Sequence, residues 1–292
     1  MPKLKGSKNL LLQFLSRNKT FSLFLRRFFT ILKMGQAGFL LRLREGDKYH
    51  WLFKSKSLKL LVNKEYYSIA REIFCKRIYG DINNVIDKNK KYIVIDIGAN
   101  RAYSTLFFAQ YGWCEKVFAF ELVRETYEYG IKNIELNRAL GAKIHMKNFG
   151  LGGEDKIIKT YFLPHRDGIS TTNLKFLEQY APEELEGRTQ IHNVECEVRK
   201  ASLVFQAIVD DYGVSDNVII KIDCEGAEYE ILLDIANNFP DFFKRVKIII
   251  GDAHFGLKEL NDILFPFGFI LSEKYITTGA VCPFLYFKET TM

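Results

Sequence analysis

The stretch Tyr92-Ile93-Val94-Ile95-Asp96-Ile97-Gly98-Ala99-Asn100 decides the fold of this 292-residue chain. An apolar run rich in β-branched residues stops at an acid and a glycine, and a segment with a helical pattern follows. A second apolar run, Lys116-Val117-Phe118-Ala119-Phe120-Glu121, then ends on another acid. Strand, helix and strand in this order predict the start of a parallel, nucleotide-binding βαβ unit.

The single glycine of the first turn separates two classes of ligand. A diphosphate cradle needs G-x-G-x-x-G, but the residues after Asp96 are Ile-Gly-Ala-Asn-Arg-Ala. An acid at this strand tip would repel a diphosphate, whereas it suits a ligand with a ribose, an ammonium and a sulfonium. Gly98 would let the backbone approach that ligand, and Glu121 is placed to accept hydrogen bonds from both ribose hydroxyls. The pattern favours S-adenosylmethionine, although an ordinary strand that ends in Asp-x-Gly is the alternative for this segment alone.

A second strand and turn, from Val218 to Glu228, end in acids at the same edge of the predicted sheet. Its string Lys-Ile-Asp-Cys-Glu-Gly-Ala-Glu begins at Lys221. With the Asp-x-Gly-Ala-Asn turn and the acid that ends the next strand, it resembles the FkbM family of S-adenosylmethionine-dependent methyltransferases. The resemblance covers about residues 90 to 290, and the string at Lys221 is its most specific part.

Three positions depart from the family pattern. Ala102 and Leu122 stand where the family usually has glycine and proline, and Asp252 replaces a glutamate two residues before His254. Alanine is small enough for helix and strand to pack, and loss of the proline removes only a rigid turn. The departures therefore bear more on the role of Asp252 than on that of His254.

The apolar runs predict an α/β domain with a doubly wound, seven-stranded, mostly parallel sheet, similar to the Rossmann-like class I methyltransferase fold. Strands are expected near 92–97, 116–121, 143–149, 218–223, 246–251, 269–275 and 282–288. Helices are expected near 102–111, 124–140, 200–212, 226–238 and 256–265. The short connector 277–280 permits an antiparallel hairpin at the end of the sheet but no crossover.

Three segments surround or interrupt the predicted methyltransferase domain of residues 91–292. Residues 1–48 form a basic amphipathic N-terminal arm, and residues 49–90 read as a helical cap, most clearly from 64 to 79. About residues 150–200 form an insertion with a predicted strand pair, 156–163 and 190–198. Between these strands lies a polar stretch with His165, Arg166, Asp167, Gly168, Ser170, Thr171 and Thr172. We interpret the insertion as the acceptor-recognition region because it leaves the ligand-binding edge of the sheet; a solvated loop is the alternative.

The basic charge of the chain is concentrated in its first residues. The net charge is +7, yet residues 1–44 carry ten Lys or Arg and no acid, which leaves 32 bases against 35 acids elsewhere. Apolar residues recur in the arm at helical spacing. Its longest uncharged run, from Asn9 to Ser16, is too short to cross a bilayer, and the arm lacks a signal-peptide pattern. Residues 1–40 are expected either to pack on the protein or to bind the anionic inner face of a membrane.

The cysteines indicate a reducing compartment, and hence a cytoplasmic protein. They are odd in number and widely spaced, which argues against both a disulfide framework and a zinc site: Cys75, Cys114, Cys196, Cys224 and Cys282. Cys224 lies between two acids that disfavour its thiolate, so we interpret it as a packing residue rather than a nucleophile.

The predicted site combines the strand-end residues with those implied by the resemblance. Residues assigned to the cofactor S-adenosylmethionine are Asp96, Gly98, Ala99, Asn100, Ser104, Glu121, Asn148, Phe149, Gly150 and Asp223. His254 is the candidate general base for a hydroxyl acceptor, with Glu225 and Asp223 as rivals. Any of these acids could instead hold a divalent metal, although no ligand set is assigned.

The expected function is methylation of a hydroxyl oxygen. The resemblance implies a sugar in a glycan, a lipid-linked saccharide or a natural product, as in polysaccharide biosynthesis. One alternative is a nucleic-acid methyltransferase that uses the basic arm, but the arm lacks an aromatic stacking platform and no nucleic acid is expected. The other is a non-catalytic, membrane-associated adaptor, against which the acids at three strand tips argue. Assembly into an oligomer is left open.

Overall fold

The chain divides into two compact units, Met1–Lys76 and Arg77–Met292. The computed structural model describes residues 19–42, 47, 49–64, 67–162, 170–171, 178, 192–214, 216–275 and 281–289. The boundary after Lys76 falls inside the segment 49–90 that the sequence analysis treated as one cap.

The first unit combines one long helix with a small antiparallel sheet. Its elements are α2 (Lys19–Gln36), β1 (Leu40–Arg42), β2 (His50–Lys54), β3 (Lys59–Asn63), α3 (Ser68–Arg71) and the π-helix η1 (Glu72–Lys76). The strand order is β1-β2-β3. The prediction of helix from residue 49 onward is therefore wrong for β2 and β3. Trp51 and Phe53 are buried at alternate positions of β2, which is the periodicity of a strand.

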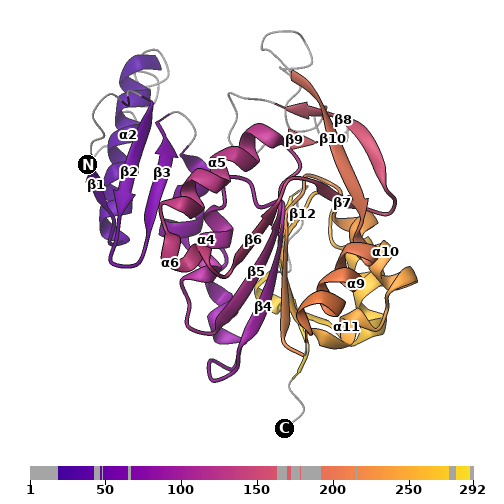
Figure 1. The fold of residues 1–292 in the computed structure, drawn as a ribbon. Coiled ribbons are helices and arrows are strands. Elements are labelled where there is room, and N and C mark those ends of the chain that lie inside the picture. The colour runs from indigo at the N-terminus through magenta and orange to yellow at the C-terminus, as the bar shows by residue number, and fades with distance from the viewer. Residues whose placement is uncertain are drawn as a thin grey trace, which may run out of the picture. The chain divides into compact units, whose positions relative to one another are not determined.

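The second unit is built on a seven-stranded sheet (Figure 1). Its strands are β4 (Tyr92–Ile97), β5 (Cys114–Phe120), β6 (Ile144–Lys147), β11 (Val218–Ile222), β12 (Val246–Ala253), β13 (Ile270–Leu271) and β14 (Cys282–Phe287). The order is β13-β14-β12-β11-β4-β5-β6, with parallel pairing except where β14 meets β12 and β13. The predicted mostly parallel sheet with an antiparallel end is confirmed, while the connector 277–280 lies outside the described residues.

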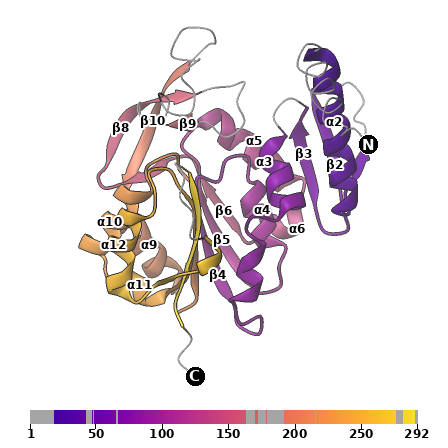
Figure 2. The ribbon, with the colours of Figure 1, turned by 180° about the vertical axis from the view of Figure 1, so that it is seen from behind.

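Helices cover both faces of this sheet, as a doubly wound fold requires (Figures 1 and 2). On one face lie α4 (Tyr103–Ala109), α5 (Arg124–Glu135) and α6 (Arg138–Gly141). On the other lie α9 (Ala201–Tyr212), α10 (Glu228–Asn238), α11 (Phe242–Arg245) and α12 (Lys258–Leu264). Short 3-10 helices occur at η2 (Gly80–Asn84), η3 (Phe265–Phe267) and η4 (Glu273–Tyr275). The core joins central strands to the second helix layer, for example Ile220 to Phe205 and Leu232.

The predicted insertion forms a separate four-stranded sheet, which lies beyond the edge of the main sheet (Figure 1). Its strands are β7 (Gly150–Gly152), β8 (Lys156–Phe162), β9 (Ser170–Thr171) and β10 (His192–Lys200), in the order β7-β10-β8-β9. The antiparallel pairing of β8 with β10 confirms the predicted strand pair. Of the polar stretch, Ser170 and Thr171 form β9, and the other five residues lie outside the described residues.

Candidate functional site

Two turns, after β4 and after β11, meet at the carboxyl edge of the main sheet. Gly98 in the first has a φ of +75°, and a Cβ atom there would lie 2.0 Å from the carbonyl oxygen of Asp223 in the second. Any larger residue would force the turns apart. Glycine is therefore required by the neighbouring turn, in addition to any approach to a ligand.

The buried carboxylate of Asp96 stabilises the first turn. It is 0% exposed, and its Oδ2 accepts hydrogen bonds from Ser104 and Thr105 at 2.8 and 2.6 Å. The Nζ of Lys221 lies 3.3 Å from its Oδ1 and donates to the carbonyl of Gly98 at 2.7 Å. Burial lowers the pKa of Lys221, but the charges of Asp96 and Asp223 and the bond to Asp96 act against it, and the net effect is a raised pKa. Asp96 and Ser104, predicted as cofactor contacts, therefore shape the turn and do not line the pocket.

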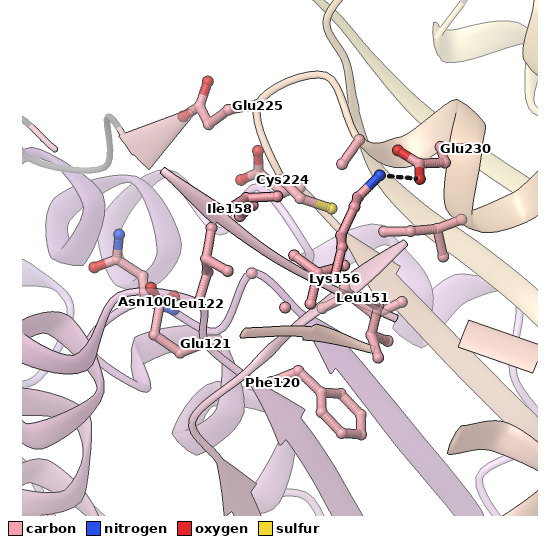
Figure 3. Close-up of a pocket in the computed structure, with 17 residues that line it drawn as sticks. Asn100, Phe120, Glu121, Leu122, Leu151, Lys156, Ile158, Cys224, Glu225 and Glu230 are labelled. Atoms are coloured by element: carbon pink, nitrogen blue, oxygen red, sulfur yellow. Dashed lines mark hydrogen bonds and ion pairs between the residues drawn. The ribbon is translucent and has the colours of Figure 1, made fainter. Parts of the chain in front are cut away.

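A pocket of about 340 Å³ opens beside the two turns (Figure 3). This volume falls within the range of small-molecule sites. Five predicted cofactor residues line it, namely Gly98, Asn100, Glu121, Gly150 and Asp223. Ala99 is 1% exposed and is not among the residues that line the pocket. The predicted cofactor residues thus divide between those that line this pocket and those, such as Asp96, Ala99 and Ser104, that do not.

Glu121 directs a buried carboxylate to the pocket from the end of β5. Its Oε2 accepts the N–H of Asn100 at 2.8 Å, and its Oε1 accepts the N–H of Val123 at 2.9 Å. Burial raises the pKa of Glu121, although these two bonds oppose the shift. Each oxygen keeps further acceptor capacity, so the carboxylate fits the two hydroxyls of a ribose.

Two more predicted cofactor residues support the lining from outside the pocket. Asn148 donates from Nδ2 to the carbonyl of Glu121 at 3.0 Å. The ring of Phe149 packs against Phe120, with 5.3 Å between centroids, and Phe120 lines the pocket. Both residues position lining groups rather than face the cavity themselves.

His254 lies directly beside the two predicted acids. Its Nε2 is 3.2 Å from Oε2 of Glu225 and 3.8 Å from Oδ1 of Asp223, and its side chain is almost fully buried. Glu225 has a φ of +55°, a left-handed conformation that is rare for a residue with a Cβ and is concentrated at functional sites. The structure therefore brings together all three predicted catalytic residues. It adds Glu228, whose Oε1 lies 2.9 Å from Nδ1 of His254 and which the sequence analysis did not assign.

The charges of the cluster shift several of its pKa values. Burial and the charge of Asp223 raise the pKa of Glu225 well above its usual value. The same two causes raise the pKa of Asp252 to about 7. Burial lowers the pKa of His254, but the bond to Glu228 and the neighbouring carboxylates outweigh it and raise the pKa to about 9. The raised pKa favours the protonated imidazole, which must lose a proton before it can act as a base.

The insertion supplies one wall of the pocket. Lys156 and Ile158 from β8 and Val198 from β10 line the cavity. The Nζ of Lys156 lies 3.0 Å from Oε1 of Glu230 on α10, which also lines it (Figure 3). The sequence analysis identified none of these lining residues, because the pairing of β8 with β10 decides which side chains face inward.

Comparison with known proteins gives a consistent result. The family model described as Methyltransferase FkbM domain matches residues 96–273. Methyltransferase 1 of Beauveria bassiana (strain ARSEF 2860) is 27% identical over 192 residues, which cover 63% of this chain and 73% of that protein.

Two solved structures illustrate the more distant similarity. The FkbM methyltransferase of Methylobacillus flagellatus KT has a TM-score of 0.43 and 17% identity, covering 68% of this chain and 43% of that one. This chain thus spans less than half of that protein. The N-terminal domain of human METTL16 in complex with SAH has a TM-score of 0.40 and 14% identity, covering 76% and 68%.

Proposed function

Because this chain belongs to the family of FkbM methyltransferase domains, we propose that it transfers the methyl group of S-adenosylmethionine to a hydroxyl of a sugar. The sugar would belong to a glycan, a lipid-linked saccharide or a natural product. One observation carries the proposal: Asp223 and Glu225 line the pocket and also contact His254. Groups that can hold the donor thus adjoin groups that can take a hydroxyl proton.

The donor supplies a methyl group that is already activated on a sulfonium. The protein therefore has to align the acceptor oxygen and remove its proton at or before attack. Glu121 would hold the ribose, and Glu225 lies apart from it on the pocket lining (Figure 3). In this proposal the hydroxyl proton passes to the cluster, where His254 is the first candidate base and Glu225 and Asp223 are its rivals.

The charge of the pocket supports a neutral, hydroxyl-rich acceptor. The carboxyl groups of Asp223 and Glu225 can exchange hydrogen bonds with sugar hydroxyls, whereas the charge of Asp223 would repel the phosphates of a nucleic acid. The decisive measurement is mass spectrometry of glycans and lipid-linked sugars from cells with and without the gene. We expect a gain of one methyl group that a His254→Ala allele does not restore. Methylation of RNA in its place would favour the alternative.

Replacement of Glu121 by alanine is expected to weaken binding of S-adenosylmethionine and S-adenosylhomocysteine by at least about tenfold, because a hydrogen bond to a charged group contributes about 1.5–3 kcal/mol. Isothermal titration calorimetry measures the affinity, and a melting curve checks the fold. Glu128→Ala, on the exposed side of α5, is the matched control. Unchanged affinity in Glu121→Ala, or a wild type that binds neither ligand, would contradict the assignment.

Helix α2 presents an exposed apolar face. Five side chains form this face, and each is more than two fifths exposed: Phe21, Phe24, Phe28, Phe29 and Leu32. Thr30 and Met34, on the opposite face, are buried, and the exposed Arg26 and Lys33 flank the apolar stripe. No helix in the described part of the chain is long and apolar enough to cross a membrane. We propose that this face lies on an anionic membrane surface, where a lipid-linked acceptor would be found.

The full-length protein is expected to float with phosphatidylserine-containing vesicles at low salt and to be released at high salt, since each basic residue contributes about 1 kcal/mol near such a surface. The double variant Phe24→Ser/Phe28→Ser should lose this binding yet keep its affinity for the donor. Leu40→Ser is the matched control because Leu40 is 64% exposed but lies on β1. Failure of the wild type to float at low salt would mean that the face packs on protein instead.

A further inference from the structure

The cluster of Asp223, Glu225 and His254 has the geometry of a cation site. One donor atom from each residue lies within 4.8 Å of the other two. Among the described residues, these three are the set of His, Cys, Asp or Glu side chains that is close enough together to hold a metal ion. A cation with bonds of about 2.0–2.2 Å holds its ligands about 3–4.4 Å apart. The donors follow β11 and β12, which are paired neighbours, so the backbone fixes their spacing.

The imidazole of His254 is oriented by the fully buried carboxylate of Glu228, which is outside this cluster of three. Oε1 of Glu228 lies 2.9 Å from Nδ1 of His254 and also accepts the N–H of Cys224 at 2.9 Å. Oε2 accepts the N–H of Gly226 at 3.0 Å. A carboxylate accepts only, so the Nδ1–H donates to Glu228 and Nε2 is directed at the two acids after β11. Metal-binding histidines are oriented in this way, and such a partner fixes both the tautomer and the ring.

Negative charge is concentrated around the same point. Four carboxylates interact electrostatically with the one imidazole, those of Asp223, Glu225, Glu228 and Asp252. The charge of Lys221, on the same strand end, is engaged by Asp96. A cation among these carboxylates would offset their mutual repulsion.

We propose that Asp223, Glu225 and His254 bind a divalent cation. Two carboxylates and one imidazole suit first-row ions such as Mn²⁺, and the two acids line the pocket, so the ion has an entry path and open coordination positions. Its role rests on the proposed function. A cation held by these residues would make a nearby acceptor hydroxyl more acidic, so that its proton could pass to a carboxylate of the cluster or to solvent; the oxygen would then bond to the methyl carbon while the C–S bond breaks and leaves its electron pair on sulfur. With the cation bound, Nε2 of His254 would be a ligand, and the proton-accepting role would fall to another group, because one lone pair cannot serve both roles.

The test is a titration of the full chain with Mn²⁺, following the electron paramagnetic resonance signal of the free ion, with and without S-adenosylhomocysteine. We expect saturable binding of about one ion per chain. Binding should be at least about tenfold weaker in Asp223→Asn and in His254→Ala, since each variant loses one of three ligands. Glu259→Gln, which alters an exposed carboxylate at the start of α12, should bind as the wild type does.

The proposal is overturned if the wild type shows no saturable binding up to about 1 mM Mn²⁺, or if Asp223→Asn binds as tightly as the wild type. Should a melting curve show that His254→Ala does not fold, the nearly isosteric Asp223→Asn decides alone. Calorimetry with S-adenosylhomocysteine separates the two proposals. A protein that binds this ligand but no Mn²⁺ loses only the cation site, whereas one that binds Mn²⁺ but not the ligand loses the proposed function.

Discussion

Replacement of His254 by alanine is expected to lower turnover by about 10²–10⁴-fold and to leave the affinity for S-adenosylmethionine nearly unchanged. The imidazole contacts Glu225 and Asp223, yet it does not itself line the pocket, so the donor keeps its own contacts. Methyl transfer from radiolabelled donor to a glycolipid extract measures the rate, and calorimetry measures the affinity.

The control for this variant is His145→Ala. His145 lies on β6, where it stacks on Phe118 with 5.2 Å between centroids, and it contributes nothing to the pocket lining. Full activity of His254→Ala would move the proton-accepting role to Glu225. Chelation distinguishes the remaining readings. If a chelator leaves the rate of the wild type unchanged while His254→Ala is slow without any chelator, the imidazole acts as a base. If the chelator slows the wild type as much as the His254→Ala substitution does, the imidazole acts as a metal ligand.

The positions of the main strands could be predicted because parallel core strands carry the strongest sequence pattern. β4 and β11 are covered by helices on both faces, so each is mostly apolar, with one charged residue just before its carboxyl end. The residues that follow β4, β5 and β11 include Gly98, Glu121 and Asp223, which do line the pocket.

The direction of each carboxylate could not be predicted, because it depends on partners distant in the sequence. Asp96 and Glu121 both follow apolar runs, yet Asp96 forms a buried ion pair with Lys221, whereas Glu121 lines the cavity. The difference comes from register: Lys221 on β11 is the partner of Asp96 on β4, and only the paired sheet brings them together.

The β2–β3 hairpin was missed for a related reason. Its two apolar clusters, Trp51 to Phe53 and Leu58 to Val62, are each too short for their period to distinguish strand from helix. The turn between them is specified by Ser55, whose Oγ accepts the N–H of Leu58 at 3.0 Å. This hydrogen bond could not be predicted from the sequence, because it depends on the folded geometry of the turn.

Replacement of Lys221 by methionine is expected to destabilise the second unit by about 3–5 kcal/mol, because it leaves the charge of Asp96 buried without its cationic partner. The Lys221 side chain is 2% exposed, and it also donates to the carbonyls of Ile97 and Gly98 at 3.2 and 2.7 Å. The turn that carries Gly98 would lose these bonds, so donor affinity should fall together with stability. Urea unfolding followed by circular dichroism measures the change, and the melting temperature should drop by roughly 10 °C.

A double-mutant cycle identifies the source of that loss. Asp96→Asn/Lys221→Met removes both charges and should recover about half of the lost stability, since the cost of Lys221→Met arises mainly from an uncompensated buried charge. Lys244→Met is the matched surface control. Its ion pair with Asp241, at 2.7 Å, is largely exposed and screened by solvent, so the unfolding midpoint should hardly move. If Lys221→Met unfolds no earlier than this control, the charge of Asp96 does not need its partner, and the backbone bonds of the two turns must hold the site together by themselves.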